Sequence, residues 1–190
     1  MNETFYYNAS TKGNTLDFSR QLTDILRRAH LANREIVLLC VGSDRSTGDS
    51  LGPLIGYKLQ YSLRGKIHIY GTLKHPVHAV NLADSIEEIY CNHDNPFIIA
   101  VDASLGSTGH IGYATICKSP LRPGIGVKKS LPEVGDLCIT GIVNLSGSGS
   151  GVLLQSTRLS VVMELADFIS TGIFMAIHSY SSSSMTCISR

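Results

Sequence analysis

The sequence predicts a single α/β domain with a mostly parallel, twisted central sheet of about five strands and helices on both faces. Short apolar runs rich in β-branched residues alternate with longer segments whose apolar residues recur at helical spacing. Several of these runs are apolar throughout, which is typical of strands covered on both faces. The 190 residues are 43% hydrophobic and 16% charged, enough to form one sizeable core.

The expected elements follow one another in a simple alternation. Strands are predicted at residues 36–41, 66–70, 97–101, 112–117 and 137–143. Helices are predicted at about residues 15–32, 50–63, 77–91 and 155–178. We therefore divide the chain into an N-terminal arm (1–14), a single α/β domain (15–180) and a flexible C-terminal tail (181–190).

Composition excludes several classes of function. The net charge is +1 without a basic or acidic block, so we expect no direct nucleic-acid binding and no membrane partner. No run approaches the ~20 apolar residues of a membrane span, and no secretory signal is expected. The five cysteines are scattered without a CxxC pair, which indicates a reduced, cytoplasmic protein. The composition is compatible with a homo-oligomer.

The stretch from Val37 to Pro53 is the most informative part of the chain. It reads as a buried strand, a polar loop with two glycines, and the start of a helix. We call residues 42–49 the acid loop, because it contains Asp44 and Asp49. In open α/β sheets, loops beyond the carboxyl ends of strands bind ligands, so this loop is a candidate site.

A second acid, Asp102, follows the apolar run 97–101. Right-handed crossovers and a reversal of winding would bring strands 36–41 and 97–101 side by side, so that Asp49 and Asp102 flank one crevice. Two close carboxylates share one proton, which allows one to act as general base and the other as general acid. Each could instead be an ordinary cap or turn residue. Asp44 is expected to point elsewhere.

Three motifs resemble those of a known family, the YyaC family of sporulation proteins, and more distantly those of spore germination proteases. They are VGS at 41–43 with TGDSLGP at 47–53, PFIIAVDASL at 96–105, and RPGIGVKK at 122–129. The resemblance implies a phosphorylase/hydrolase-like three-layer α/β/α fold, shared with hydrogenase maturation proteases. It also implies an aspartic-type endopeptidase of spore-forming bacteria with Asp49 and Asp102 as catalytic residues.

The natural substrates implied by the resemblance are small acid-soluble spore proteins, in the mother cell, forespore or spore core. We expect Ser43, Ser104, Gly124 and Lys128 to bind substrate, and loops 119–132 and 145–151 to line or cover the crevice. The alternative is a catalytically inactive, peptidase-like spore protein that holds a peptide or protein partner.

A metal-dependent version of the site is the second alternative, because hydrogenase maturation proteases use two acids and a histidine around a metal ion. The third ligand would come from His75, His78 or His110, with Asp49, Asp102 and His75 as the first choice. No histidine occurs in the two acid motifs, so we expect no cofactor and no stoichiometric transition metal on the purified protein. His68, within a strand, is expected to be structural.

Two other chemistries have weaker support. Ser43, Ser46, Ser50 and Ser104 lie near the expected crevice, but no G-x-S-x-G elbow occurs. The strand–glycine loop–helix pattern could bind a phosphate, but no Gly-Lys-Ser/Thr follows and Asp49 would repel the anion.

Overall fold

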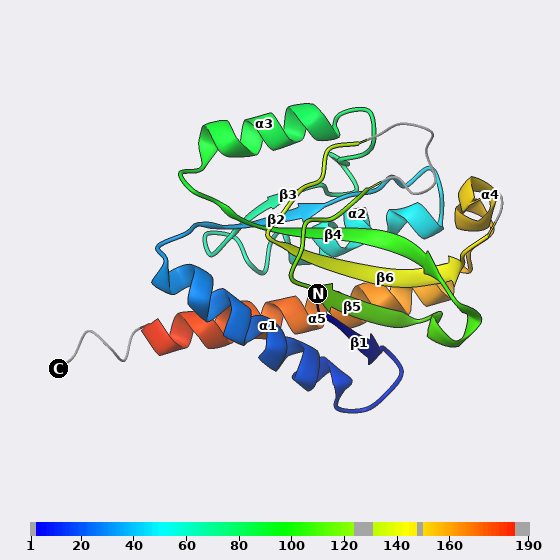
Figure 1. Ribbon diagram of the computed structural model, residues 1–190, viewed down its shortest axis with the longest axis horizontal. Coiled ribbons are helices and arrows are strands. Elements are labelled where there is room, and N and C mark those ends of the chain that lie inside the picture. Colours follow the sequence, from blue (N-terminus) through cyan, green and yellow to red (C-terminus); the bar gives the residue numbers. More distant parts are fainter. Residues whose placement is uncertain (1–2, 124–130, 148–149, 185–190) are drawn as a thin grey trace.

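The computed structural model describes residues 3–123, 131–147 and 150–184, and its centre is a six-stranded sheet (Figure 1). The spatial order is β1-β5-β6-β4-β2-β3. The strands are β1 (Thr4–Asn8), β2 (Ile36–Cys40), β3 (His68–Tyr70), β4 (Phe97–Gly106), β5 (Tyr113–Cys117) and β6 (Leu137–Leu145). β3, β2, β4 and β6 are mutually parallel, whereas β5 runs antiparallel to both β6 and β1.

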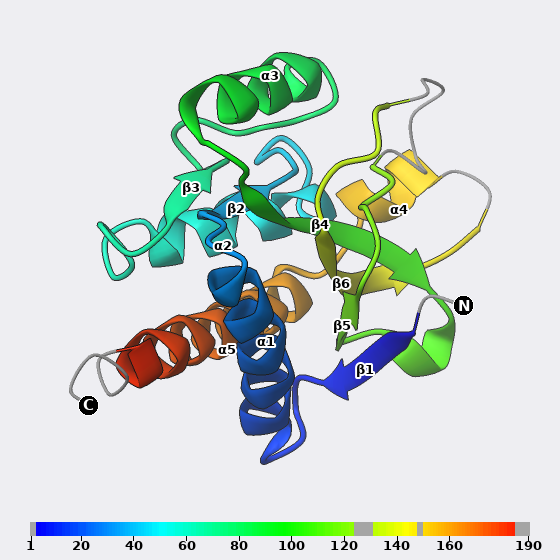
Figure 2. The same cartoon turned by 60° about the vertical axis from the view of Figure 1, so that its left-hand side comes forward.

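Helices cover both faces of this sheet (Figure 2). They are α1 (Asn14–Leu31), α2 (Leu51–Leu59), α3 (Leu82–Asn92), α4 (Ser150–Gln155) and α5 (Leu159–Ser184), with short 3-10 turns at Gly48–Ser50 and Thr108–His110. Leu38 and Cys40 of β2 pack in the core with α1, α2 and α5, while Val37 and Leu39 pack in the smaller core under α3. The predicted three-layer α/β/α fold is therefore confirmed.

The long helix α5 belongs to the larger core. Its segment Leu159–Tyr180 has a mean hydropathy of 1.6 and, by length and composition alone, could cross a membrane. No such segment was expected from the sequence, because serines and threonines interrupt the apolar residues of this helix. In the structure 56% of this segment is buried, and Ile169 and Ile173 lie in the core. A buried core helix explains its composition.

The chain ends differ from expectation. Residues 4–8, assigned to an N-terminal arm, form the edge strand β1, which pairs along its length with β5. At the other end α5 continues to Ser184, into the expected tail. The Ser/Gly-rich segment before it contains the start of α4 at Ser150. Backbone pairing and helix continuation thus order segments whose composition alone suggested loops.

The reversal of winding lies between β2 and β4, as predicted. After β2 the chain adds β3 on one side, and then β4 on the other side of β2. β2 ends at Cys40, opposite Val101, whereas β4 continues to Gly106 beside β6. The Val41 N–H still donates to the Val101 carbonyl at 2.7 Å, and Val41 also bridges to Val77; beyond Val41 the chain leaves β4. A crevice therefore opens beside β4 at residue 102.

Candidate active site

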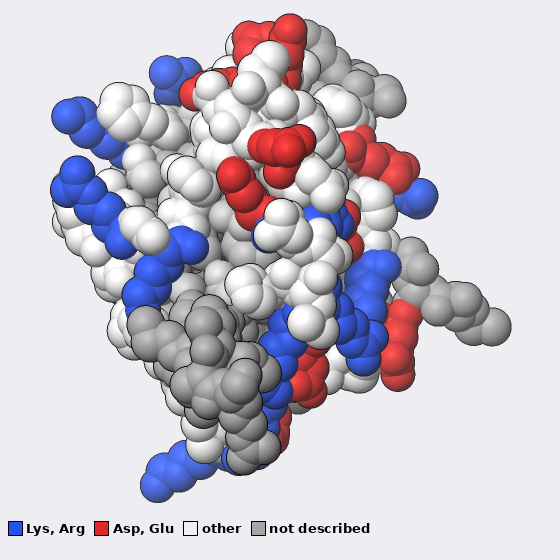
Figure 3. All heavy atoms as spheres, turned by 90° about the vertical axis from the view of Figure 1, so that its left-hand side faces the viewer, with Lys and Arg blue, Asp and Glu red and all other residues white. Residues whose placement is uncertain are grey.

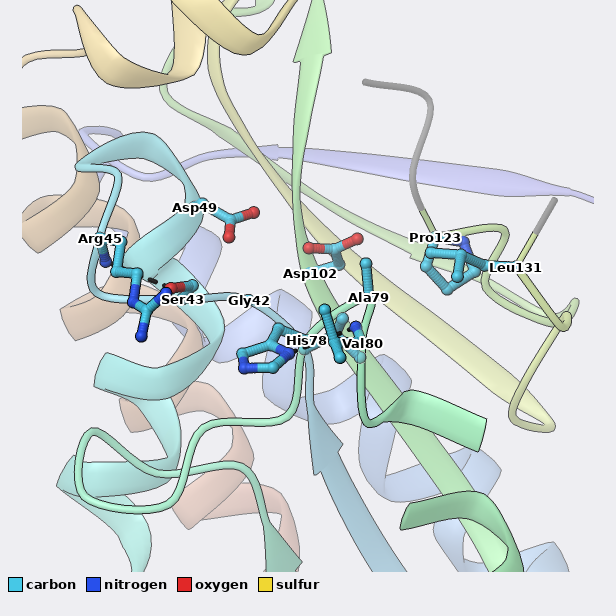
Figure 4. A pocket seen from close by; sticks show the side chains of 11 residues that line it. Gly42, Ser43, Arg45, Asp49, His78, Ala79, Val80, Asp102, Pro123 and Leu131 are labelled. Carbon is cyan, nitrogen blue, oxygen red and sulfur yellow. Dashed lines mark hydrogen bonds between the residues drawn. The ribbon is translucent and has the colours of Figure 1, made fainter. Parts of the chain in front are cut away.

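A pocket of about 280 Å³ lies at this reversal (Figure 4). Its walls come from the end of β2, the acid loop, the segment before α3, β4, and the two described ends of the 119–132 loop. The lining residues are Val41, Gly42, Ser43, Arg45, Asp49, His78, Ala79, Val80, Asp102, Pro123 and Leu131. Both predicted acids are among them.

Asp102 reaches the pocket from within β4, opposite Thr140 of β6. Its Oδ1 accepts a hydrogen bond of 2.7 Å from the backbone N–H of Ala103. Burial raises the pKa of Asp102 well above its ordinary value, the negative charge of Asp49 raises it further, and the Ala103 N–H opposes both effects. Asp102 therefore retains a proton at pH values where an exposed aspartate is ionised.

Asp49 reaches the pocket from the 3-10 turn that precedes α2. Its backbone carbonyl accepts a hydrogen bond of 3.1 Å from the N–H of Ser43, which folds the acid loop back on itself. Gly42, with φ +139°, permits this turn, because a Cβ there would lie 2.0 Å from the Asp49 carbonyl oxygen. Asp49, for which the sequence also allowed the role of helix cap, therefore belongs to a closed loop that directs its carboxylate into the pocket.

The two carboxylates point into the same space (Figure 4). Burial also raises the pKa of Asp49, but the Ser43 N–H and the nearby His78 lower it in part. Asp102 lacks such a compensating side chain and experiences the charge of Asp49 directly. The favoured state of the pair therefore has the proton on Asp102 and the negative charge on Asp49, which is one acid and one base in one pocket.

The substitution Asp102→Asn is expected to stabilise the protein increasingly as pH rises. The folded chain holds the Asp102 proton above the ordinary pKa of 3.8, where the unfolded chain has lost it, so folding stability falls with pH across that window. Asparagine has no such proton to lose. Thermal unfolding at a series of pH values, with the exposed Asp44→Asn as control, measures this; wild type and Asp102→Asn with parallel pH profiles would contradict it.

His78 and Arg45 are the pocket groups with ionisable side chains other than the two acids. The N–H of Val80 donates to His78 Nδ1 at 3.3 Å, so a neutral ring carries its proton on Nε2. The sequence indicated His78 only as a candidate metal ligand, and it gave no indication of a role for Arg45. The signal for His78 was its position after strand β3, at the carboxyl edge of the sheet.

The pocket does not fit the metal-dependent alternative. His75, the first choice for a third ligand, is exposed and does not line the pocket. His78 does line it, but its ligand atoms and those of the two acids do not all lie within 4.8 Å of one another. In addition, the Val80 N–H occupies Nδ1 and a proton occupies Nε2. His110 instead hydrogen-bonds to Ser107 at 2.8 Å.

The other expected site residues divide into three groups. Ser43 lines the pocket. Ser104 does not, because its hydroxyl lies within hydrogen-bond distance of Thr140 Oγ1 and the Gly141 carbonyl, at 3.2 and 3.3 Å. Gly124 and Lys128 lie outside the described residues. In the 119–132 loop the structure describes residues 119–123 and 131–132, and Pro123 and Leu131 line the pocket. In the second loop, none of the described residues 145–147 lines it.

The fold defines a class of protein, the one that shares the fold of a hydrogenase maturation protease. The chain is similar to the crystal structure of a NiFe hydrogenase maturation protease, HycI from Thermococcus kodakarensis, with a TM-score of 0.54 and 16% identity. The match covers 81% of this chain and 99% of that one. At this identity the likeness concerns the fold alone.

Sequence comparison identifies the family. Residues 6–172 match the family described as "Protein of unknown function (DUF1256)". Over 152 residues the chain is 53% identical to the "Uncharacterized protein YyaC" of Bacillus subtilis, which covers 80% of this chain and 73% of the relative. The chain therefore belongs to the YyaC family, as its motifs predicted.

Proposed function

We propose that this protein is an endopeptidase in which Asp49 and Asp102 hydrolyse a peptide bond with an activated water. The observation that carries the proposal is the meeting of two carboxylates, from separate segments, in one pocket with raised pKa values. The shared fold with a maturation protease supports the same reaction class. Strongly perturbed acids in a cleft are typical of catalytic sites.

The proposed reaction follows from the protonation state. The ionised Asp49 accepts a proton from water as the water oxygen bonds to the peptide carbonyl carbon. Asp102 donates its proton to the peptide nitrogen as the C–N bond breaks, which releases an amine and a carboxylic acid. Transfer of a proton from Asp49 to Asp102 then restores the starting state. Each acid acts once as donor and once as acceptor, so the reaction needs no external group.

The pocket walls indicate the kind of peptide that fits. Val80 is 86% exposed at the pocket, and Pro123 and Leu131 add apolar surface. Arg45 supplies an exposed positive charge to the pocket lining. This combination favours a peptide with an apolar side chain near the scissile bond and an acidic residue close by. Small acid-soluble spore proteins, in the cytoplasm of the sporulating cell or spore, are the substrate class we propose.

The test is to incubate the purified full chain with small acid-soluble spore proteins across a pH series and identify fragments by mass spectrometry. Specific fragments should appear, with a rate that rises as Asp49 ionises and falls as Asp102 loses its proton. Fragments that form equally at every pH would contradict the acid–base assignment. Tight binding without cleavage would contradict the peptidase proposal and favour the peptide-holding alternative.

A further inference from the structure

A second cluster of ionisable side chains lies at the other edge of the sheet, where β2, β3 and β4 begin. Glu35 directly precedes β2, His68 is the first residue of β3, and His93 follows α3 just before β4. These strands are neighbours in the order β4-β2-β3, so their amino ends bring the three side chains together. One ligand atom from each residue lies within 4.8 Å of the others. The candidate active site is at the opposite, carboxyl ends of β2 and β4.

His93 is the centre of this cluster and is buried. Its Nδ1 lies 2.8 Å from Oε2 of Glu35, and its Nε2 lies 3.0 Å from the Tyr70 hydroxyl. The ring of His68 packs against it, with ring centroids 4.2 Å apart. Glu35 and His68 are exposed, so an ion from solvent can reach the open side of the cluster.

We propose that Glu35, His68 and His93 bind a divalent transition-metal ion, with zinc as the expected ion. Two imidazoles and one carboxylate form a donor set that Zn²⁺ takes in proteins, with a water completing the tetrahedron. The ion would bind His93 Nδ1 in place of the proton now shared with Glu35. That proton moves to Nε2, and the Nε2–H donates a hydrogen bond to the Tyr70 hydroxyl oxygen.

The surroundings of His93 are those of a metal-ligating histidine. Such a histidine donates its other ring N–H to a nearby acceptor, which fixes the ring orientation, and Tyr70 is positioned for this role. The backbone carbonyl of Glu35 accepts a hydrogen bond of 2.6 Å from the N–H of Phe97, which ties β2 to β4 beside the cluster. Glu35 is thus held by backbone pairing beside the start of β4, and His68 belongs to strand β3.

Charge around the cluster also favours a cation. Figure 3 views the end of the molecule where β2 begins and α3 ends; Asp and Glu side chains gather in its upper part, over α3, whereas Lys and Arg side chains are spread over its left side and centre. The nearby Arg34 is engaged elsewhere, because its Nη1 lies 2.7 Å from Asp136 Oδ1. The acidic side chains in the upper part of this face favour the approach of a cation.

This proposal departs from the expectation of a metal-free protein. That expectation was based on the absence of histidines from the two acid motifs, and His68 was expected to be structural. It could not include His93, because only the folded sheet brings residues 35, 68 and 93 together. An ion at this site would join the beginnings of three strands and stabilise the folded chain, without contacting the candidate active site.

The test is a zinc titration of the full chain after removal of metals with a chelator, followed by calorimetry and thermal unfolding. The wild type should bind one Zn²⁺ through this cluster and unfold at a higher temperature when zinc is present. His68→Ala, an exposed substitution, should abolish both effects. Tyr70→Phe should weaken binding about 10- to 100-fold, the usual effect of removing a partner of a ligating histidine.

Two controls keep the test specific. His75→Ala removes an exposed histidine at the other edge of the sheet and should bind zinc like the wild type. Asp102→Asn should also retain this site. Absence of zinc binding, binding unchanged in both His68→Ala and Glu35→Gln, or binding lost in Asp102→Asn would overturn the proposal. None of these results depends on whether the protein cleaves peptides.

Discussion

Asp49→Asn and Asp102→Asn should each lower the peptidase rate by about 100- to 10,000-fold while the protein remains folded. That range is the usual contribution of a general acid or base, and asparagine keeps the shape of the side chain without its proton chemistry. Asp49→Asn removes the group that accepts the proton of water, and Asp102→Asn removes the proton for the departing nitrogen. The measurement is the cleavage rate at saturating substrate, alongside circular dichroism to verify the fold.

The double variant should be little slower than either single variant, because the two acids act as a unit. Asp44→Asn is the matched control, since it alters an exposed acid of the same loop that does not line the pocket. We expect it to retain most of the activity. Full activity in either Asp49→Asn or Asp102→Asn would refute the catalytic pair.

Gly52→Ala should cause the second large effect, on stability and on the shape of the pocket together. A Cβ at this position would lie 2.1 Å from the carbonyl oxygen of Val41, so α2 must move away from the end of β2. Overpacking of this kind costs roughly 1–3 kcal/mol or more. For a chain of this length, each kcal/mol lowers the unfolding temperature by about 2–4 °C.

The matched control is Gly151→Ala, because a Cβ at Gly151 of α4 has no atom within 4 Å. It should be neutral or slightly stabilising, since alanine favours helix over glycine. Thermal unfolding of the two variants measures the difference. Equal unfolding temperatures would contradict the close packing of α2 on β2 that positions Asp49.

Much of the fold could be predicted from the sequence because β2 and the first half of β4 are short, wholly apolar runs. The adjacency of β2 and β4 followed from crossover handedness, and the structure confirms it. β1 could not be predicted, because its alternation of exposed and half-buried residues arises only when it pairs with β5. The extent of β4 beyond Asp102 was missed for a similar reason, since its outer half pairs with β6 alone.

The site was predictable only where a residue lies within a motif. Asp49 and Asp102 stand in the two acid motifs, at the ends of strands whose neighbours could be inferred. His78 and Arg45 are in loops whose paths depend on backbone pairing, such as the Gly42 N–H that donates to the Val77 carbonyl at 2.7 Å. Ser104 was misassigned because β4 continues past it and directs its hydroxyl toward β6. Closeness in sequence to Asp102 therefore did not place Ser104 in the pocket.

The pairing of β1 with β5 and of α1 with α5 has a consequence for the order in which the chain folds during synthesis. The first strand and first helix leave the ribosome long before their partners, since Tyr7 pairs with Ala114, and Phe18 of α1 packs on Phe168 of α5 at 5.4 Å between ring centroids. Contacts so distant in sequence form late and slow folding. The apolar face of α1 that packs on α5 therefore stays uncovered until the last helix is made, which prolongs the exposure of apolar surface to aggregation.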